Sequence, residues 1–408
     1  MSLIVQKYGG TSLAGAERIR AVAARVSARK QAGNDLVVVV SAMGDTTDEL
    51  IALAQALSPE PDPRELDLLL STGEVVSGTL MAIALRSLGH QAISLTGAQA
   101  GILTDRSFRR ARIQSVDPAR IRRELAEGKI VVVAGFQGVS EDLDVTTLGR
   151  GGSDTTAVAM AASLRADACE IYTDVTGIYT ADPRVAPSAR QLQDISYDEM
   201  LELAAQGARV MHPRAVELGQ IFGIPILVAS SFSDQPGTII RAEVHMESRN
   251  KVRGIAHDLG VARITVIGVP DRPGVAAALF EPLAQAGISV DIIVQNASHD
   301  DDAVTDLSFT IARDDLPEAG RLMDPIVREL GARDWVSSGQ FGKVSIVGTG
   351  MQSAPGYAAR MFRALHQADI NIHMITTSEI RITCIVAEDQ VPAAVRALHE
   401  AFALEQGD

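Results

Sequence analysis

Short runs of valine and isoleucine alternate with helix-like patterns from Met1 to about Arg241, and this alternation constrains the fold more than any other feature. The clearest runs are Leu36–Val40, Ile130–Ala134, Glu170–Thr173 and Ile224–Val228. Runs that are apolar at nearly every position are typical of strands buried on both faces of a parallel sheet. The segments with apolar residues at helical spacing include Ala14–Lys30, Asp48–Leu57, Gly73–Leu88 and Thr155–Leu164. The pattern predicts an α/β domain in which helices sandwich a mainly parallel sheet.

An internal repeat occupies the C-terminal part of the chain. One copy runs from Ile264 to Asn296 and the other from Val344 to Thr376, and the second copy has two extra residues in the loop after its first strand. Each copy has the strand and helix pattern of a ferredoxin-like βαββαβ unit. The polar stretch Glu243–Lys251 is typical of a linker. We therefore expect a first domain at 1–241, a linker and leading strand at 242–262, and two small domains at 263–333 and 341–405.

The composition excludes several classes of protein. With 51 acidic and 37 basic residues the formal net charge is −14, whereas a surface that binds nucleic acid or an anionic membrane is basic. There is no stretch of 18 apolar residues and no secretory leader pattern, so we expect a cytoplasmic protein without a membrane segment. The two cysteines, Cys169 and Cys384, have no metal-ligand spacing, which predicts reduced thiols in the core.

The first motif that can carry chemistry, KYGGTS, follows the apolar run Leu3–Val5 directly. Lys7 ends the predicted strand, and Gly9 and Gly10 precede the predicted helix. A strand–glycine–helix turn can offer backbone N–H groups and a positive helix end to an anion, with Lys7 at the rim. The same glycines would also suit a purely structural turn.

The segment GRGGSDTTA is the most specific of the polar segments. Arg150 offers the forked geometry that suits a carboxylate or phosphate, and the glycines after it let a ligand approach the backbone. Asp154 stands where a helix begins and could instead be a cap. Glu74 could be a solvated residue of a first helical turn or could bind an ammonium group. Together, Glu74 and Arg150 would fit a zwitterion, with the ammonium at Glu74 and the α-carboxylate at Arg150.

Five segments in a fixed order, together with the repeat, resemble a known family. They are KYGGTS, SAMGDTTDEL, LLSTGEVVSG, TLGRGGSDTTAVAMA and YTDVTGIYTADPR, and TTSEIRI follows in the second repeat copy. The ensemble resembles aspartokinases, members of the amino-acid-kinase superfamily with paired ACT domains, over essentially the whole chain. The resemblance implies ATP-dependent phosphorylation of L-aspartate to 4-phospho-L-aspartate with Mg²⁺. This reaction is the entry step of the lysine, threonine, methionine and diaminopimelate pathways.

The resemblance also implies roles for individual residues. Catalysis falls to Lys7, acting with Mg²⁺, and to Asp154, which would orient Lys7 or the metal shell. The substrate-binding residues would be Ser41, Thr47, Glu74, Arg150 and Ser153. The nucleotide-binding residues would be Lys7, Tyr8, Gly9, Gly10, Thr173, Asp174, Tyr179, Asp182, Arg184, Arg209 and Val210. Gly9 and Gly10 would supply backbone donors. Arg209 stands where many relatives have lysine, and it keeps the charge but not the compact ammonium geometry. The sequence contains no protein metal cage, as expected for a cation held mostly by phosphates and water.

Regulation is implied by the ACT-like pair. Lysine, threonine or both would bind between the first unit of one subunit and the second unit of a partner. The effector-binding residues would be Asp271, Gly274, Ala276, Gln295, Asn371, Ile372, Thr377, Ser378 and Glu379. Any one of them could also be an ordinary turn residue at a strand end. The expected assembly is a homodimer, or an α₂β₂ tetramer in which a short regulatory chain starts near Met246.

Two other functions stay open from the residues alone. The first is an amino-acid sensor whose kinase domain no longer turns over, which the presence of Lys7, Asp154 and Asp182 disfavours. The second is a kinase that acts on glutamate or carbamate. Glu74 with Arg150 disfavours carbamate, because carbamate has no ammonium group. Which end product inhibits is not evident from the sequence.

Overall fold

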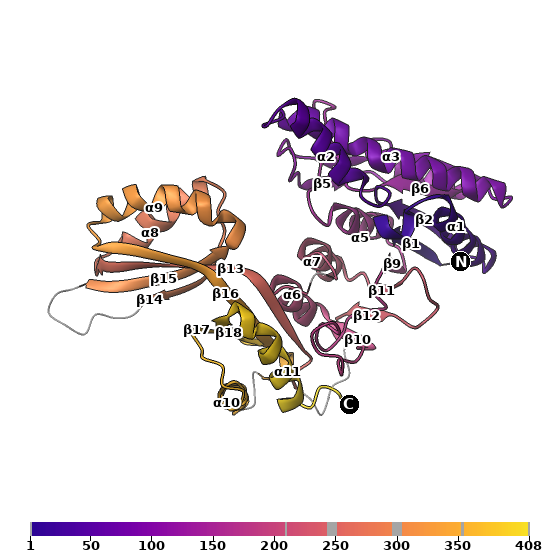
Figure 1. Ribbon diagram of the computed structural model, residues 1–408. Coiled ribbons are helices and arrows are strands. Elements are labelled where there is room, and N and C mark those ends of the chain that lie inside the picture. The colour runs from indigo at the N-terminus through magenta and orange to yellow at the C-terminus, as the bar shows by residue number, and fades with distance from the viewer. Residues whose placement is uncertain (1, 209, 243–250, 296–303, 352–354, 407–408) are drawn as a thin grey trace. The chain divides into compact units, whose positions relative to one another are not determined.

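The computed structural model describes residues 2–208, 210–242, 251–295, 304–351 and 355–406 (Figure 1). Contacts divide the chain into two compact units. The first contains Met1–Tyr179, Gln191–Ala205 and Arg209–Glu247, and the second contains Thr180–Arg190, Gln206–Ala208 and Ser248–Asp408. The segment Thr180–Arg190 therefore packs in the second unit, which the sequence did not indicate. Arg209 and the predicted start at Met246 lie outside the described residues.

An eight-stranded sheet forms the centre of the first unit, in the order β10-β12-β11-β9-β1-β2-β6-β3. Its strands are β1 (Leu3–Tyr8), β2 (Asp35–Val40), β3 (Ala92–Leu95), β6 (Ile130–Ala134), β9 (Ala168–Thr173), β10 (Asp194–Ser196), β11 (Ile226–Ser230) and β12 (Thr238–Arg241). Every neighbouring pair is parallel except β11 with β12. All residues of β6 are buried, as the apolar run predicted. The prediction of a mainly parallel sheet is confirmed.

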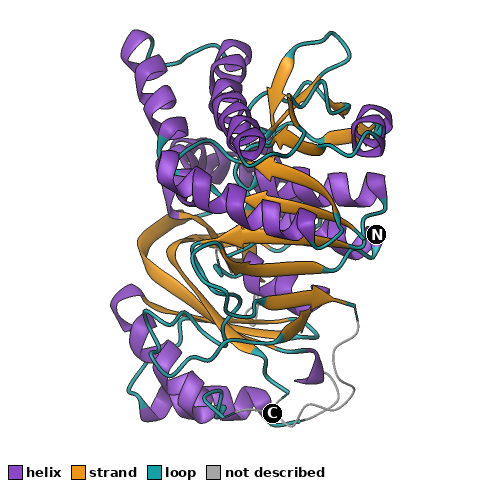
Figure 2. Cartoon of the chain, turned by 90° about the vertical axis from the view of Figure 1, so that its right-hand side faces the viewer, coloured by secondary structure: helices purple, strands orange, loops and turns teal. Residues whose placement is uncertain are grey.

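Helices cover both faces of this sheet (Figure 2). The helices of the first unit are α1 (Ala16–Gln31), α2 (Thr46–Leu57), α3 (Pro63–Ser87), α4 (Ala119–Ala126), α5 (Gly152–Leu164), α6 (Tyr197–Ala205) and α7 (Pro213–Phe222). Helices α1 and α3 share a core with alternate residues of β2, such as Val38. Helix α5 packs against β1, β2 and β9. Helix α3 begins ten residues before its predicted start. Its N-terminus is set by Asp62, whose carboxylate accepts N–H bonds from Arg64 and Glu65, and by Pro63 in the first turn.

The first unit also contains a small sheet that the sequence did not predict. Its strands, in the order β5-β4-β7-β8, are β4 (Ile102–Thr104), β5 (Ile113–Val116), β7 (Gln137–Val139) and β8 (Val145–Thr147). Short strands of three or four residues carry too weak a pattern to be recognised from sequence alone. This sheet brings the β4–β5 loop beside the loop after β8, where Ala111 N donates to Thr147 O at 2.9 Å.

A six-stranded antiparallel sheet forms the second unit, in the order β14-β15-β13-β16-β18-β17. Its strands are β13 (Gly254–Pro270), β14 (Val290–Gln295), β15 (Val304–Ala312), β16 (Asp334–Val347), β17 (Met374–Thr377) and β18 (Arg381–Ala387). Its helices are α8 (Val275–Gln285), α9 (Leu316–Leu330), α10 (Tyr357–Gln367) and α11 (Val391–Ala401). Figure 1 shows α8 and α9 together over one half of the sheet, and α10 and α11 together against the other half. Each helix pair covers its own hydrophobic core.

Two long strands, β13 and β16, join the repeat copies into this one sheet. They pair from Gly254 opposite Val347 to Ile267 opposite Asp334. The first half of β13 thus belongs to the second copy, although it precedes the first copy in the chain. The expectation that each copy supplies all of its own strands is wrong for the second copy. In the described residues no strand follows α11, whereas β16 follows α9 in the first copy, and the place beside the second half of β16 is filled by β13. The predicted domain boundaries at residues 263 and 341 fall inside these two strands.

The prediction of a cytoplasmic protein rested on the two cysteines and on the lack of a long apolar segment. Cys169 and Cys384 are buried and free, as predicted, and burial raises the pKa of Cys384 to about 12. Among the described residues, α3 is long and apolar enough to span a membrane by length and composition. Half of its most apolar stretch is buried inside the protein. Because α3 packs against β2, β3 and β6, its apolar residues have a place in the core of the first unit.

Candidate active site

Several predicted site residues follow parallel strands at one edge of the central sheet. Strands β9, β1, β2 and β6 are successive parallel neighbours, so the loops after them leave the sheet at the same edge. Ser41 N donates to Tyr8 O at 3.1 Å, and Gly44 N donates to Gly10 O at 3.0 Å. These bonds bring the glycine pair after β1 against the loop that carries Ser41. Thr47, in the first turn of α2, is half-buried near the end of that loop.

Lys7 and Asp154 form an ion pair at this edge. The Lys7 Nζ lies 2.7 Å from Asp154 Oδ1, and each residue is only 9% exposed. Lys7 is the last-but-one residue of β1, and Asp154 lies in the first turn of α5 beside the buried Ser153. The residue at the N-cap of α5 is Gly151, and no side chain caps the helix. The alternative in which Asp154 is only a helix cap is therefore excluded.

The structure bears on two predictions for the first motif. The Gly9 N–H donates to Tyr172 O at 3.1 Å, so it is already used and is not a free donor for an anion. A Cβ at Gly9 would lie 3.5 Å from Lys7 Nζ, which is an ordinary van der Waals distance, so packing alone does not require glycine at this position. The Tyr8 side chain is fully buried and stacks on Tyr172 with 4.9 Å between ring centroids. This side chain faces the core, because neighbouring strand residues point to opposite sides of the sheet, so it is not available to a nucleotide.

Glu74 lies in the middle of α3 and is only 3% exposed. Its Oε1 accepts a hydrogen bond from Ala42 N at 3.0 Å, just beyond the end of β2. Its Oε2 is buried and has no hydrogen-bond partner among the described residues. Burial raises the Glu74 pKa to about 8, and the Ala42 N–H offsets only part of this rise. The alternative of a solvated first-turn residue is excluded. A buried acceptor without a donor points to a partner that is supplied by a ligand.

Arg150 is exposed in the loop between β8 and α5. Its neighbours Gly149 and Gly151 both have left-handed backbone conformations, with φ of 76° and 68°. Within the part of the chain that the structure describes, Arg150 makes no ion pair. Its guanidinium is therefore available to an anionic ligand.

The predicted nucleotide segment is divided between the two units. In the first unit, Thr173 Oγ1 donates to Asp174 Oδ1 at 3.1 Å, and the Tyr179 hydroxyl lies 2.7 Å from Thr176 Oγ1. In the second unit, Asp182 and Arg184 form an ion pair at 2.7 Å. The Arg184 guanidinium holds the pKa of Asp182 below its usual value. Val210 is half-buried in the first unit.

The predicted effector residues all lie in the second unit, in two groups. Gly274 is the left-handed N-cap of α8 (φ 93°), Asp271 and Ala276 are exposed beside it, and Gln295 ends β14. The other group surrounds β17 and consists of Asn371, Ile372, Thr377, Ser378 and Glu379. Strands β14 and β17 form the two opposite edges of the sheet.

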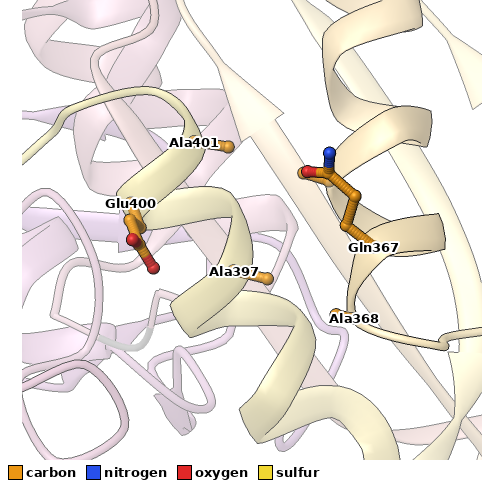
Figure 3. A pocket seen from close by; sticks show the side chains of 6 residues that line it. Gln367, Ala368, Ala397, Glu400 and Ala401 are labelled. Atoms are coloured by element: carbon orange, nitrogen blue, oxygen red, sulfur yellow. The ribbon is translucent and has the colours of Figure 1, made fainter.

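A concave region of about 440 Å³ lies between α10 and α11 (Figure 3). Its lining consists of Ala364, Gln367, Ala368, Ala397, Glu400 and Ala401. Alanine is too small to fill the space between two helices, which accounts for the hollow. None of the predicted effector residues lines it.

Comparison with known proteins places the chain in a family. The amino acid kinase family matches residues 2–230, and the ACT domain family matches residues 264–323 and 344–402. The aspartokinase of Mycolicibacterium smegmatis is 53% identical over 412 residues, covering 100% of this chain and 98% of that protein. The chain belongs to the aspartokinase family. It is thus an aspartate kinase by family, with ACT domains after the kinase domain.

Solved structures of this family have the same fold. The E. coli aspartokinase III structure in complex with aspartate and ADP matches with a TM-score of 0.81 and 26% identity, covering 98% of this chain and 99% of that chain. The structure of the same E. coli protein in complex with lysine and aspartate matches with a TM-score of 0.74, at the same identity and coverage.

Three residues beside the site were not predicted from the sequence. They are Asp67, His212 and Arg214, which contact the loops around Arg150. A signal for Asp67 existed, because it lies seven residues before Glu74 and so on the same face of a helix. That signal depended on recognising Asp62 and Pro63 as a helix start. No local pattern marks His212 or Arg214, because their partners lie far away in the chain.

Proposed function

We propose that this protein transfers the γ-phosphoryl group of ATP to the side-chain carboxylate of L-aspartate and that amino-acid effectors inhibit it through the ACT domains. The observation that carries the proposal is the unpartnered Glu74 Oε2 beside the carboxyl end of β2. The α-ammonium of an amino acid would supply the missing donor. Arg150 would bind its α-carboxylate, since an arginine fork matches a carboxylate. The aspartate and ADP complex of the E. coli relative supports this choice of substrates.

The chemistry needs no general base. The side-chain carboxylate of aspartate is already ionised at neutral pH. One of its oxygens attacks the γ-phosphorus, the bond from that phosphorus to the β,γ-bridging oxygen breaks, and ADP leaves with the electron pair. Catalysis then consists of alignment and of charge stabilisation. Lys7 would stabilise the charge on the transferring group, and Asp154 would fix the Lys7 ammonium through their 2.7 Å contact.

Magnesium is part of the proposal through the nucleotide. In the described ranges, no group of three or more His, Cys, Asp and Glu side chains could hold a metal ion. Asp154 and the hydroxyl groups of Ser41 and Thr47 are oxygen donors, which suit Mg²⁺. A cation bound mostly by phosphate oxygens and water would need no more than these residues. It would neutralise the phosphate charge during transfer.

The direct test traps the acyl phosphate with hydroxylamine. We expect aspartyl hydroxamate to form only with both ATP and aspartate, and glutamate to give no more than background. Arg150→Ala should raise the aspartate KM by about tenfold or more, because a charge-assisted contact is lost, and leave the ATP KM nearly unchanged. Equal activity on glutamate, or ADP release without hydroxamate, would reject aspartate as the acceptor.

For regulation, we infer that lysine, threonine or both bind where the edge at β14 of one chain meets the edge at β17 of a partner. The two groups of effector residues lie at opposite edges of the sheet in one chain, which favours a site shared by two chains. The lysine complex of the E. coli relative supports an amino-acid effector. A homodimer would suffice, and an α₂β₂ assembly with a short chain from Met246 is the second form. The buried free thiols are compatible with the reducing cytoplasm.

Titration of lysine and threonine, separately and together, tests this regulation. We expect inhibition by at least one of these additions, and Asn371→Ala should raise the half-inhibitory concentration by about tenfold, within the usual range of allosteric coupling. The rate without effector should stay within about twofold of the parent. If no combination alters the rate, the ACT domains of this protein sense something else.

A further inference from the structure

Two loops of the first unit converge at Arg150. One is the β8–α5 loop with Leu148, Gly149 and Arg150, and the other is the β4–β5 loop with Arg109 and Ala111. The Ala111 N–H donates to Thr147 O at 2.9 Å, which joins the two backbones. A Cβ at Gly149 would lie 2.9 Å from Arg109 O, so only glycine allows this close approach.

From α3, Asp67 holds both loops with one carboxylate. It is completely buried, and it accepts the Arg109 N–H with both oxygens, at 3.1 and 2.9 Å. It also accepts the Thr147 N–H and the Thr147 hydroxyl, each at 2.7 Å. Within the described residues, its hydrogen bonds go only to Arg109 and to Thr147, the last residue of β8. Asp67 therefore orders both loops.

From α7, Arg214 holds the same two loops with one guanidinium. One of its NH2 groups donates to Leu148 O at 2.9 Å and the other donates to Ala111 O at 3.1 Å. His212, at the N-cap of α7, packs directly on Gly151, where a Cβ would lie 2.3 Å from the His212 Cβ. The backbone is therefore held just before Arg150 by Arg214 and just after it by His212.

We propose that Arg214 and Asp67 are positioning residues that fix the Arg150 guanidinium for the α-carboxylate of the amino-acid substrate. This inference rests on the proposed function. Arg150 itself is exposed and stands between two glycines, the residue type with the most conformational freedom to lose. Without the contacts from Arg214 and Asp67, the loop would place Arg150 correctly for only part of the time. The apparent affinity for the substrate is then the intrinsic affinity multiplied by that fraction of time.

Arg214→Gln is the main test, because glutamine can satisfy at most part of the two-carbonyl contact. We expect it to raise the aspartate KM by about tenfold, which corresponds to a loop that holds Arg150 correctly in about one tenth of the molecules. The ATP KM, and kcat at saturating aspartate, should stay within about twofold. Arg214→Lys keeps the charge but not the fork, so it should give a smaller increase. The control is Arg86→Gln, which removes an arginine–carbonyl bond, to Ala92 O at 2.8 Å, from the far end of α3.

A double-mutant cycle shows whether Arg214 acts through Arg150. In an Arg150→Ala background there is nothing left to position, so Arg214→Gln should raise the aspartate KM by less than about twofold. Multiplicative effects of the two changes, or equal losses for aspartate and ATP, would overturn the inference. If Arg214→Gln does not fold, the same cycle is run with Arg214→Lys.

Failure of the inference and failure of the proposed function give different results. An unchanged aspartate KM in Arg150→Ala alone would remove Arg150 from the substrate site and reject that part of the proposed function. A raised aspartate KM in Arg150→Ala, together with unchanged kinetics in both Arg214 variants, would reject only the positioning role.

Discussion

Replacing Lys7 with alanine is expected to lower kcat by at least about 100-fold, the effect of removing a preorganised charge from a phosphoryl-transfer site. Lys7 is the cation buried at the end of β1, and it is held 2.7 Å from Asp154. The aspartate and ATP KM values should change far less, because the charge on the transferring group is stabilised mainly in the transition state. Steady-state kinetics with both substrates varied would separate these quantities.

The matched control is Lys30→Ala. Lys30, in the last turn of α1, also pairs with a carboxylate, Asp35 Oδ1 at 2.9 Å, but Asp35 is at the start of β2, at the opposite edge of the sheet. Its replacement should leave kcat unchanged. Since breaking a buried ion pair costs about 3–5 kcal/mol of stability, Lys7→Met combined with Asp154→Asn serves as a neutral pair that leaves no buried charge behind. A folded Lys7 variant with kcat within tenfold of the parent would contradict the assigned role.

Glu74→Gln is expected to raise the aspartate KM by about 100-fold near pH 9, because a buried charge-assisted contact with the substrate ammonium is lost. The parent should show a particular pH dependence. With a pKa of about 8, Glu74 is mostly protonated at pH 7 and must lose its proton to accept the ammonium. The kcat/KM of the parent enzyme for aspartate should therefore rise about tenfold per pH unit below this pKa and level off above it. The glutamine variant should lack this rise.

The raised pKa of Glu74 also predicts how the stability of the folded protein changes with pH. The folded pKa of about 8 lies above the ordinary value of 4.5, so the folded state binds the Glu74 proton more tightly. The contribution of Glu74 to stability is thus complete below about pH 4.5 and is lost as the pH rises towards about 8. Denaturation of the parent and Glu74→Gln across this window should show a difference that grows in favour of glutamine. The control is Glu65→Gln on the same helix, where the carboxylate is exposed and paired with Arg64. A difference independent of pH would contradict the buried ionisation.

Much of the fold followed from local pattern. Strands such as β2 and β6 are continuous apolar runs, and this pattern arises wherever both faces of a strand are covered. The place of the site followed as well, because neighbouring parallel strands all present their following loops at one edge. That Asp154 lies beside Lys7 was implied only by the family resemblance, because α5 follows β8 of the small sheet and not a strand of the central parallel sheet.

Tertiary structure alone decided how these residues are used. Glu74 is buried with one oxygen unpartnered because α3 approaches Ala42 closely. A Cβ at Gly73 would lie only 2.8 Å from the Ala42 Cβ. The Gly9 N–H is already used because it donates a hydrogen bond to Tyr172 O, and Tyr172 lies far away in the chain.

The sequence by itself determined the parallel sheet, the repeat and the motifs, because these depend on periodicity and on residues close together in the chain. Only the tertiary structure decided that β13 completes the second ACT unit, that Thr180–Arg190 packs in the second unit, and that Arg214 and Asp67 hold the Arg150 loop. The physical reason is that strand pairing and buried hydrogen bonds join whichever backbone groups remain unsatisfied once the elements pack. The residues that lie close to such a group in the sequence do not indicate which distant group becomes its partner.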